Sequence, residues 1–379
     1  MIASMFARDS SADPAGVPRR FRAWMRWIRR ASKRSLLPLV LLLPAAMAGA
    51  QEQLRFGVLG LFHPRELGLE QADRQVVAIV PDGVQSSSAL VLNGEPGHRK
   101  QIFHAKGSLV VVGSGSARSW TAAARSGGEV PFRLDVPGKL RRVYVGRLTV
   151  LARNGELMAV VTMDRETAVA SIVAAEMEES TPMEALKAQA VATRSFLAAG
   201  ARHLDFDFCD TTHCQFIKSP PSITSRVSVA VQATRGLVIA YHDKPLAALY
   251  SSRCGGHTRS LRDEGMEPGE GYPYYAVPCA WCQQHPFVWR SRIGASAQSP
   301  QPGDERQRIF QARQWGWSAV PGSDFRATRD GLGWQLEGHS VGHGVGMCQH
   351  GASGMAASGE NFREILAHYY PNTALVSQP

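Results

Sequence analysis

An apolar helical face in the middle of the chain ends on a carboxyl group, Glu176. The segment 167–177 (TAVASIVAAEM) has the helical period, and it places Val169, Ile172 and Val173 on the same face as Glu176. A carboxyl group in apolar surroundings has a raised pKa, so it stays protonated close to neutral pH, as a general acid must. The alternative is a hydrated glutamate at a helix end, because two further glutamates follow within three positions. The shared apolar face favours the general acid.

A short segment further along the chain holds four residues of the types that bind zinc. His203, Cys209, His213 and Cys214 lie within twelve positions, and imidazole and thiolate are ligands that tetrahedral Zn²⁺ prefers. A disulfide between Cys209 and Cys214 is the competing interpretation for an exported protein. Since a disulfide leaves the two histidines unexplained, we expect a structural zinc ion.

Two further cysteine motifs fit more than one interpretation. Cys254 is followed three positions later by His257, and Cys279 is followed in the same way by Cys282. This spacing suits a metal site, and it suits a disulfide between Cys279 and Cys282 equally well.

The glycine-rich string GHSVGHGVGMCQHG (338–351) places histidines close to Cys348. A thiol beside imidazoles is a pattern of cysteine nucleophiles, but no asparagine or aspartate in a recognisable context accompanies this one. The glycines indicate backbone that approaches a ligand closely. Among the histidines we place His343 nearest a substrate, and a structural hydrogen bond from its ring is the alternative.

Two consecutive helices are predicted to position these groups. Thr181 and Pro182 restart the chain as an N-cap and a first helical residue, and Glu184 fits the third position of a capping box. On this second helix Lys187 and Arg194 share a face, from which they could hold an acidic sugar or orient the acid of the first helix. Solvated helix charges are the alternative.

Short apolar runs broken by Gly, Pro, Ser and Asn dominate the chain before these helices. The runs RVYVGRLTVLA and LMAVVTM are joined by Asn154-Gly155, a strong signal for a β-hairpin. Alternating patterns return after the second helix. We therefore predict an α+β fold in which a mixed, β-rich scaffold supports the helical pair. We divide it into a β-rich region over 51–139 and a catalytic domain over 140–379.

Residues 1–50 have the layout of a secretory signal peptide. A basic stretch, MRWIRRASKR, precedes a short apolar run, LLPLVLLLPAAMA, and the segment closes on Ala48-Gly49-Ala50. The apolar run contains two prolines and is short for a bilayer span of ~20 residues. We expect cleavage and export to the periplasm or cell envelope, with membrane contact only through this segment. An uncleaved anchor is the alternative.

The net charge of +10 does not indicate a nucleic-acid partner. Residues 1–34 hold nine Lys or Arg against two Asp, so most of the charge lies in the terminal segment. The remainder lacks the concentrated basic charge of nucleic-acid-binding proteins. Its composition, with 44% hydrophobic and 20% charged residues overall, is that of a globular protein.

Several strings together resemble the stage II sporulation protein D family, also called SpoIID/LytB. They follow the family's order and cover roughly residues 140–375: RVYVGRLTV with NGEL, IVAAEM, PMEALKAQAVATRSF, CDTTHCQ, YSSRCGGHT and GHGVGMCQHGASGMA. The resemblance implies a lytic transglycosylase that acts on the glycan strands of peptidoglycan. Such an enzyme manages with one carboxyl group, because the substrate's own C6 hydroxyl is the nucleophile.

The resemblance also implies roles for individual residues. The glutamate of the EM pair would be the acid and base, with a lysine and an arginine on the next helix contributing. The His/Cys segment binds zinc in some family members, and the Tyr–Ser stretch lines the cleft. Here these are Glu176, Lys187 and Arg194 for catalysis, His203, Cys209, His213 and Cys214 for zinc, and Tyr250, Ser251 and Ser252 for the cleft.

Other family members stimulate cell-wall amidases, so a non-catalytic, wall-binding enhancer of an amidase is the competing hypothesis. One stretch and two positions depart from the family's pattern. The run before the EM pair, VVTMDRETAVASIV, lacks the acidic and aromatic residues of an LEDYL-like string. Glu178 stands where a proline usually follows the EM pair, and Cys348 stands where a serine is usual in GMSQ.

Overall fold

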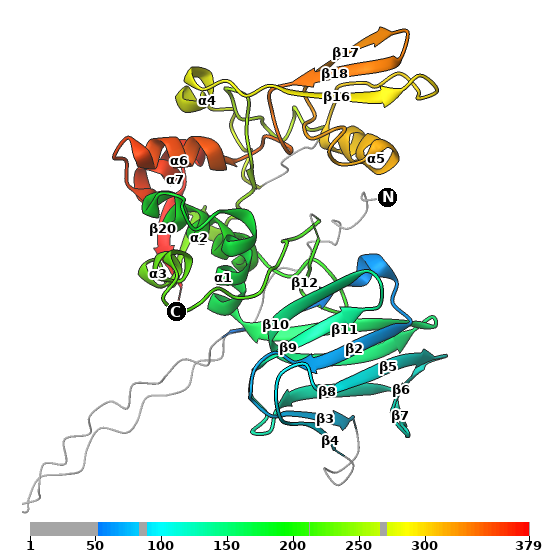
Figure 1. Cartoon of the computed structure of the whole chain (residues 1–379). Helices are drawn as coiled ribbons and strands as arrows, with labels where there is room; N and C mark the ends of the chain where they lie inside the picture. The colour runs from blue at the N-terminus through cyan, green and yellow to red at the C-terminus, as the bar shows by residue number, and fades with distance from the viewer. Residues whose placement is uncertain (1–51, 83–88, 212, 266–270, 379) are drawn as a thin grey trace, which may run out of the picture. The chain divides into compact units, whose positions relative to one another are not determined.

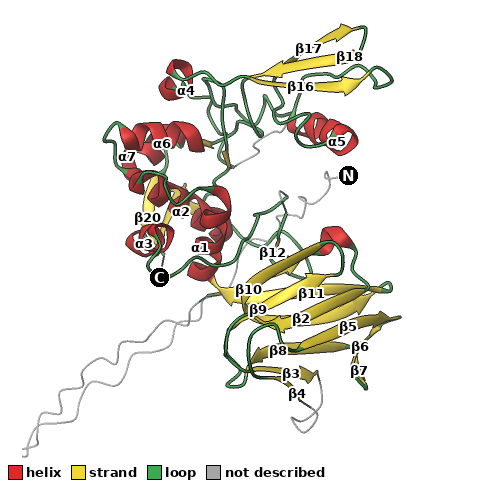
Figure 2. Cartoon of the chain, in the orientation of Figure 1, coloured by secondary structure: helices red, strands yellow, loops and turns green. Residues whose placement is uncertain are grey.

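The computed structural model describes residues 52–82, 89–211, 213–265 and 271–378, so the predicted signal peptide over 1–50 lies outside the described residues. The described residues belong to one compact unit. They have mixed α and β structure, as predicted, with seven α-helices and twenty strands in this part of the chain (Figure 1; Figure 2). No helix within it is long and apolar enough to cross a bilayer.

Twelve strands form one curled, mostly antiparallel sheet. Its longest strand, β10 (Leu140–Arg153), pairs with β9 up to Gly146, and beyond that point with β8 and β11. A Cβ at Gly146 would lie 2.5 Å from the Thr162 carbonyl oxygen, so only glycine fits where the partners change. The other strands are β1 (Gln53–Val58), β2 (Glu66–Gln71), β3 (Val77–Pro81), β4 (Leu90–Leu92), β5 (Lys100–Lys106), β6 (Leu109–Val112), β7 (Gly115–Ala117), β8 (Ser119–Ala124), β9 (Val130–Val136), β11 (Glu156–Asp164) and β12 (Phe208–Cys209).

The predicted hairpin is present between β10 and β11. Asn154 and Gly155 have φ values of 55° and 78°, which is the left-handed backbone that a two-residue hairpin turn requires. The predicted boundary between 51–139 and 140–379 falls in the turn between β9 and β10. These two strands pair with each other, so the sheet continues across that position.

Five helices pack together, with α2 (Met183–Ala198) at their centre (Figure 2). Almost every residue of α2 from Ala185 onward is buried, because the helix contacts four other helices and strand β13. The helix before it begins directly after β11, where Asp164 accepts a hydrogen bond from Thr167 N at 3.0 Å. The four helices around α2 are α1 (Arg165–Glu176), α3 (Arg226–Ala233), α6 (Gln349–Ala357) and α7 (Phe362–Tyr369).

The start of α2 corrects one local prediction. Pro182 is the N-cap instead of Thr181, and no side chain caps the helix. The Glu184 carboxylate does not close a capping box. It accepts hydrogen bonds from Lys187 Nζ at 2.6 Å and from Phe362 N at 2.9 Å. The first turn of α7 offers unpaired N–H groups, and tertiary packing brings them within reach of this carboxylate.

Two small sheets lie next to the helices. In the first, β13 (Leu237–Tyr241) pairs with β14 (Lys244–Pro245) and with β20 (Ala374–Ser377). In the second, β15 (Tyr250–Ser251) pairs in parallel with β19 (Met347–Cys348). This second pairing brings the Tyr–Ser stretch beside the glycine-rich string.

A third small sheet has a core of its own. It consists of β16, β18 and β17 in that order and packs with α5 around Trp289, Val320 and Leu336. A short helix, α4, precedes it and contacts α6. The bounds are α4 (Ala280–Gln284), β16 (Trp289–Gly294), α5 (Glu305–Trp315), β17 (Phe325–Asp330) and β18 (Gly333–Gly338).

The main hydrophobic core is continuous from the large sheet into the helices. Val161 of β11, Ile172 of α1, Val191 of α2 and Leu366 of α7 all belong to it. The helix that carries the predicted acid is therefore fixed to the same core as the sheet.

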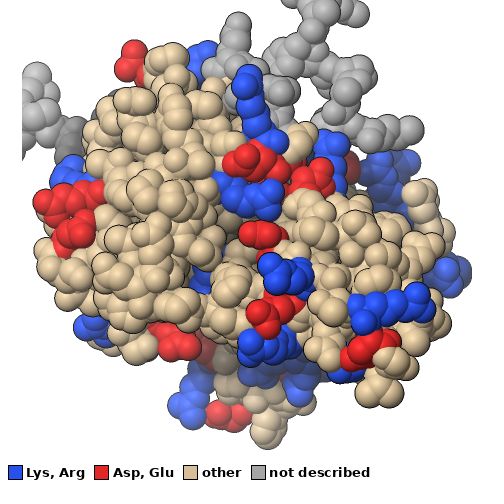
Figure 3. Space-filling model, turned by 90° about the horizontal axis from the view of Figure 1, so that it is seen from above, with Lys and Arg blue, Asp and Glu red and all other residues tan. Residues whose placement is uncertain are grey.

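On the molecular face of Figure 3, Lys and Arg side chains lie beside Asp and Glu, with wide uncharged areas between them.

Candidate functional site

Glu176 is the last residue of α1. The three apolar residues predicted to share its face, Val169, Ile172 and Val173, are fully buried, whereas Glu176 itself is half-buried. Burial raises the pKa of its carboxyl group, and this outweighs a hydrogen bond from Gln349 and the nearby charge of Lys218, which both lower it. The carboxyl group is thus biased toward the protonated form that a general acid needs.

Gln349, the first residue of α6, connects Glu176 to α2. Its amide nitrogen donates to Glu176 Oε2 and to Gln189 Oε1, both at 3.3 Å. Gln189 in turn donates to Thr193 Oγ1 at 3.2 Å, and both of these side chains are fully buried. Both hydrogens of the Gln349 amide have an acceptor, so the amide has one preferred orientation and constrains the Glu176 carboxyl group.

Tyr250 brings a hydroxyl group to the same network. It donates to Gln215 Oε1, and it also interacts with the side chains of Thr193 and Gln189. The pKa of Tyr250 is raised well above its ordinary value, first by burial and then by the negative charge of Glu176. The phenol therefore stays protonated, and Gln215 accepts its hydrogen.

The two serines after Tyr250 differ in their surroundings. Ser251 is buried, and its Oγ has no hydrogen-bond partner within the described residues. Ser252 is exposed, and its carbonyl oxygen accepts a hydrogen bond from His350 N at 3.1 Å. The hydroxyl of Ser251 is therefore a buried polar group without a partner among the described residues.

His343 lies beside Tyr250 because the glycine-rich string approaches β15 closely. Its Nδ1 accepts a hydrogen bond from Val345 N at 3.0 Å, and its ring also forms a hydrogen bond with the backbone of Tyr250. Burial lowers the pKa of His343, so the ring is biased toward the neutral form. A Cβ at Gly346, where φ is 73°, would lie 1.9 Å from the Leu249 carbonyl oxygen, so glycine is required there.

Lys187 and Arg194 both contact acidic residues other than Glu176. Arg194 is fully buried and forms a bidentate ion pair with Glu166, through Nε at 2.8 Å and Nη2 at 2.7 Å. Glu166 lies ten residues before Glu176, which is about 15 Å along a helix. Lys187 pairs with Glu184 at 2.6 Å. The structure thus brings Tyr250 close to Glu176, whereas Arg194 joins α2 to α1 through Glu166 and Lys187 forms its ion pair within α2.

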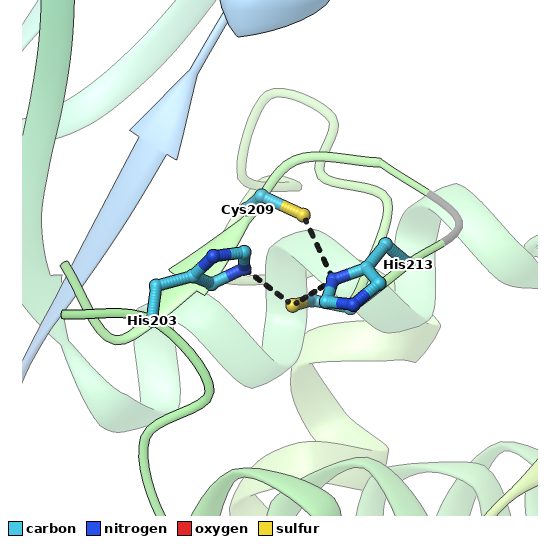
Figure 4. A group of neighbouring side chains, drawn as sticks. His203, Cys209 and His213 are labelled. Atoms are coloured by element: carbon cyan, nitrogen blue, oxygen red, sulfur yellow. Dashed lines mark hydrogen bonds between the residues drawn. The ribbon is translucent and has the colours of Figure 1, made fainter. Parts of the chain in front are cut away.

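The four predicted zinc ligands are brought together in the segment after α2 (Figure 4). His203 Nε2 and His213 Nδ1 lie 3.2 and 3.3 Å from Cys214 Sγ, and His213 Nδ1 lies 3.8 Å from Cys209 Sγ. One ligand atom from each residue lies within 4.8 Å of the others, and both thiols are free. Two imidazole nitrogens and two sulfurs at these distances fit a tetrahedral zinc ion.

A cavity of about 450 Å³ lies next to this cluster. Cys209, Asp210 and Thr211 form part of its wall, and His63 and Glu156, which lie 2.9 Å apart, line it from other segments. Glu176 is not among the lining residues. The cavity is therefore separate from the network around Glu176.

Cys348 does not have the surroundings of a cysteine nucleophile. The thiol is fully buried, and its sulfur lies 3.6 Å from Cys282 Sγ and 3.3 Å from Gly351 N. The nearby His350 instead accepts a hydrogen bond from the Trp281 indole at 3.2 Å. Its imidazole is thus directed at an indole instead of the thiol that a nucleophilic pair would require.

Comparison with known proteins assigns the chain to a family. The sequence model of the stage II sporulation protein family, SpoIID, matches residues 153–241. An uncharacterized protein of Brachyspira hyodysenteriae is 31% identical over 270 residues, which cover 62% of this chain and 72% of that protein. The chain belongs to the stage II sporulation protein D family. Stage II sporulation protein D of Bacillus subtilis is 26% identical over 265 residues, 55% of this chain and 74% of that protein.

A further relative is named for another activity. The amidase enhancer of Bacillus subtilis is 23% identical over 284 residues, which cover 54% of this chain and 40% of that protein. The SpoIID match contains Glu176, Arg194 and the four His/Cys residues. It ends before Tyr250, His343 and Gln349.

Sequence reasoning missed the glutamines of this SpoIID protein, Gln189, Gln215 and Gln349. Glutamine is mostly exposed in proteins and carries no signal of reactivity. For Gln189 a signal was available, because it lies with Thr193 on the buried side of α2, where a polar pair needs a partner. No local pattern marks Gln349, because its two acceptors come from other helices.

Proposed function

We propose that this chain is a lytic transglycosylase that cleaves the glycan strands of peptidoglycan, with Glu176 as acid and base. The observation that supports the proposal is a carboxyl group whose pKa is raised by burial while Gln349 holds it and Tyr250 lies beside it. A group poised in this way can deliver a proton to an oxygen atom and take one back.

The proposed reaction needs no water. Glu176 protonates the glycosidic oxygen, the bond between that oxygen and C1 breaks, and the leaving sugar departs as an alcohol. The C6 hydroxyl of the retained sugar then attacks C1 and gives its proton to Glu176, which closes a 1,6-anhydro ring. Hydrolytic glycosidases use two carboxyl groups that flank the bond. Here the only side chains among the described residues that shift the pKa of Glu176, in either direction, are Gln349 and Lys218, and neither is an acid.

The other predicted site residues receive roles in this scheme. We propose that Tyr250, Ser251, Ser252 and His343 line the bound strand. The Ser251 hydroxyl has no partner among the described residues. The Tyr250 hydroxyl donates its hydrogen to Gln215, and its oxygen can accept a hydrogen bond from a sugar hydroxyl group. For Arg194 we propose a positioning role, because its ion pair with Glu166 fixes α1.

We propose a structural zinc ion at His203, Cys209, His213 and Cys214, where the donor set fits. Bound zinc would tie the segment after α2 to β12 and would take no part in the reaction. Zinc analysis tests this on the full chain without chelator. Replacing His213, which is exposed, by alanine should lower the zinc content by up to one ion per chain. An unchanged zinc content would contradict the assignment.

The proposed activity also requires that the chain be exported. Residues 1–50 would be removed as a signal peptide, which places the enzyme in the periplasm or envelope, where glycan strands are found. The catalytic domain would begin near residue 140. Sequencing the N-terminus of the protein recovered from cells tests the cleavage, which should fall after Ala50.

Purified glycan strands without stem peptides provide the test of the activity. The full mature chain should release fragments whose anhydro ends are lighter than hydrolysed ends by one water molecule. Glu176→Gln should lower this release by at least a hundredfold. Glu178→Gln is the matched control, since Glu178 is exposed, and it should keep the parent rate. Hydrolysed ends, or equal rates for the two variants, would refute the assignment.

A non-catalytic enhancer of a cell-wall amidase is the second candidate function. It is favoured by the similarity to the protein named amidase enhancer. Stimulation of a purified amidase by wild-type chain and by Glu176→Gln separates the two candidates. If both stimulate equally and the wild type releases no anhydro ends, the enhancer function holds and the transglycosylase fails.

A further inference from the structure

Four cysteines from three distant segments meet inside the protein. Cys254 follows β15, Cys279 and Cys282 flank the start of α4, and Cys348 ends β19. All four side chains are buried and free. Their sulfur atoms all lie within 4.8 Å of one another. This set of residues, the four-cysteine cluster, contains every cysteine outside the His/Cys segment.

The membership of the cluster corrects the grouping suggested by sequence spacing. His257, which the spacing pairs with Cys254, is exposed, and its Nδ1 lies 3.5 Å from Gln283 Nε2. Cys348 contributes the fourth ligand group instead. Gly255 and Gly256 have φ values of 72° and 117°, so the chain turns sharply after Cys254 and carries His257 away from the sulfurs.

The distances fit a coordination shell better than disulfides. Tetrahedral zinc binds sulfur at about 2.3 Å, so neighbouring sulfurs lie about 3.8 Å apart. Cys282 Sγ and Cys348 Sγ are 3.6 Å apart, whereas a disulfide needs about 2.05 Å. Disulfides would also join the sulfurs in separate pairs, while here each sulfur is close to all three others.

Polar groups around the cluster are suited to thiolates. Gly351 N donates to Cys348 Sγ at 3.3 Å, and the Tyr369 hydroxyl lies 3.4 Å from Cys279 Sγ. A Cβ at Gly351 would lie 2.4 Å from Cys279 Sγ, so glycine lets α6 approach the sulfurs. Hydrogen bonds of this kind orient metal ligands and offset the negative charge that four thiolates bring.

We infer that Cys254, Cys279, Cys282 and Cys348 bind one structural zinc ion. Each thiol gives up its proton as the sulfur coordinates the metal. The ion would join β15, α4 and β19, and Cys348 directly precedes Gln349, whose amide holds the Glu176 carboxyl group. The zinc would therefore fix the start of α6 and, through Gln349, the position of the proposed acid. The assignment stands on the cluster alone and does not require that the chain be an enzyme.

The test uses the full mature chain purified with zinc and without chelator. In the variant His203→Ala/His213→Ala, which removes the two imidazoles of the other cluster and leaves all six cysteines intact, we expect one zinc per chain. X-ray absorption of that variant should show four sulfur neighbours at about 2.3 Å. Cys282→Ser in the same background should abolish both signals. After unfolding with a chelator, wild-type chain should titrate six thiols, the full cysteine count.

Several results would overturn the inference. The first is that the histidine variant contains no zinc, or contains iron instead. The second is an X-ray absorption spectrum with nitrogen neighbours around the metal. The third is a titration of only two thiols after unfolding, which would mean that the four cysteines form two disulfides. Because the histidine variant leaves the cluster untouched, a folding defect of Cys282→Ser does not weaken the test. If wild-type chain holds a single zinc with four sulfur neighbours, the four-cysteine assignment stands and the His/Cys zinc fails.

Discussion

Glu176 Oε2 and Gln349 Nε2 lie 3.3 Å apart, although 173 positions separate the two residues along the chain. The contact joins the end of α1 to the start of α6. The hydrogen bond favours the charged carboxylate, while burial favours the neutral acid. The protonation of Glu176 therefore depends on a balance that single substitutions can shift in a known direction.

Gln349→Leu should move the upper limb of the pH–activity profile to higher pH. Without its hydrogen bond the carboxylate is less stable, so the pKa of Glu176 rises further and the acid stays protonated at higher pH. The rate at the optimum should fall about tenfold because the carboxyl group loses its orientation. Gln284→Leu, at an exposed glutamine of α4, is the control. A lower rate with an unshifted limb would leave Gln349 a purely structural role.

Glu176→Gln should become more stable relative to wild type as the pH rises. The pKa of Glu176 is raised above its ordinary value of 4.5 in the folded state, so the folded protein binds more protons than the unfolded chain. Wild-type stability therefore falls as the pH rises through the interval between 4.5 and the folded value, and it is unaffected below 4.5. Denaturant unfolding from pH 4 to 8 measures the difference. Glu178→Gln should show no such trend, and a flat difference for Glu176→Gln would contradict the raised pKa.

Arg194→Met should destabilise the fold by about 3–5 kcal/mol, because it leaves the Glu166 carboxylate partly buried without its partner. Glu166→Met/Arg194→Met should recover part of the loss. Recovery stays incomplete because Arg194 also donates to the carbonyl oxygens of Val231 and Leu237, at 3.3 and 3.2 Å. Unfolding curves of the four proteins form a double-mutant cycle. Unchanged stability with lost activity would point to direct contact with substrate instead.

Gly346→Ala should cost ~3 kcal/mol or more of unfolding free energy, because the new Cβ meets the Leu249 carbonyl oxygen. Gly138 has a similar φ of 68° with nothing within 4 Å of its Cβ position. Gly138→Ala should therefore cost only the backbone strain of roughly 1–2 kcal/mol. Equal losses would show that the close approach of the glycine-rich string to β15 is not tight.

Local patterns predicted several features that the structure confirms. The helical period that ends on Glu176 predicted that Val169 and Ile172 lie on a buried face, and Asn154-Gly155 predicted the hairpin. These succeed because the residues involved are neighbours in sequence, and their geometry follows from backbone period and turn chemistry. The N-cap of α2 failed even locally, since a distant helix provided the Glu184 carboxylate with better partners.

The tertiary structure decided which distant groups meet. Sequence spacing paired Cys254 with His257, while the fold set Cys348 beside Cys254. Arg194 has the sequence context of a surface charge, yet packing buries it against Glu166.

The sequence by itself determined the residue types available for chemistry and the elements that carry them, including the four predicted zinc ligands of the short His/Cys segment. Packing of α1, α2 and α6 against one another determined that Gln349 holds Glu176 and that four separate cysteines share one interior site. Contacts of this range depend on how whole elements pack, and no short stretch of sequence encodes them.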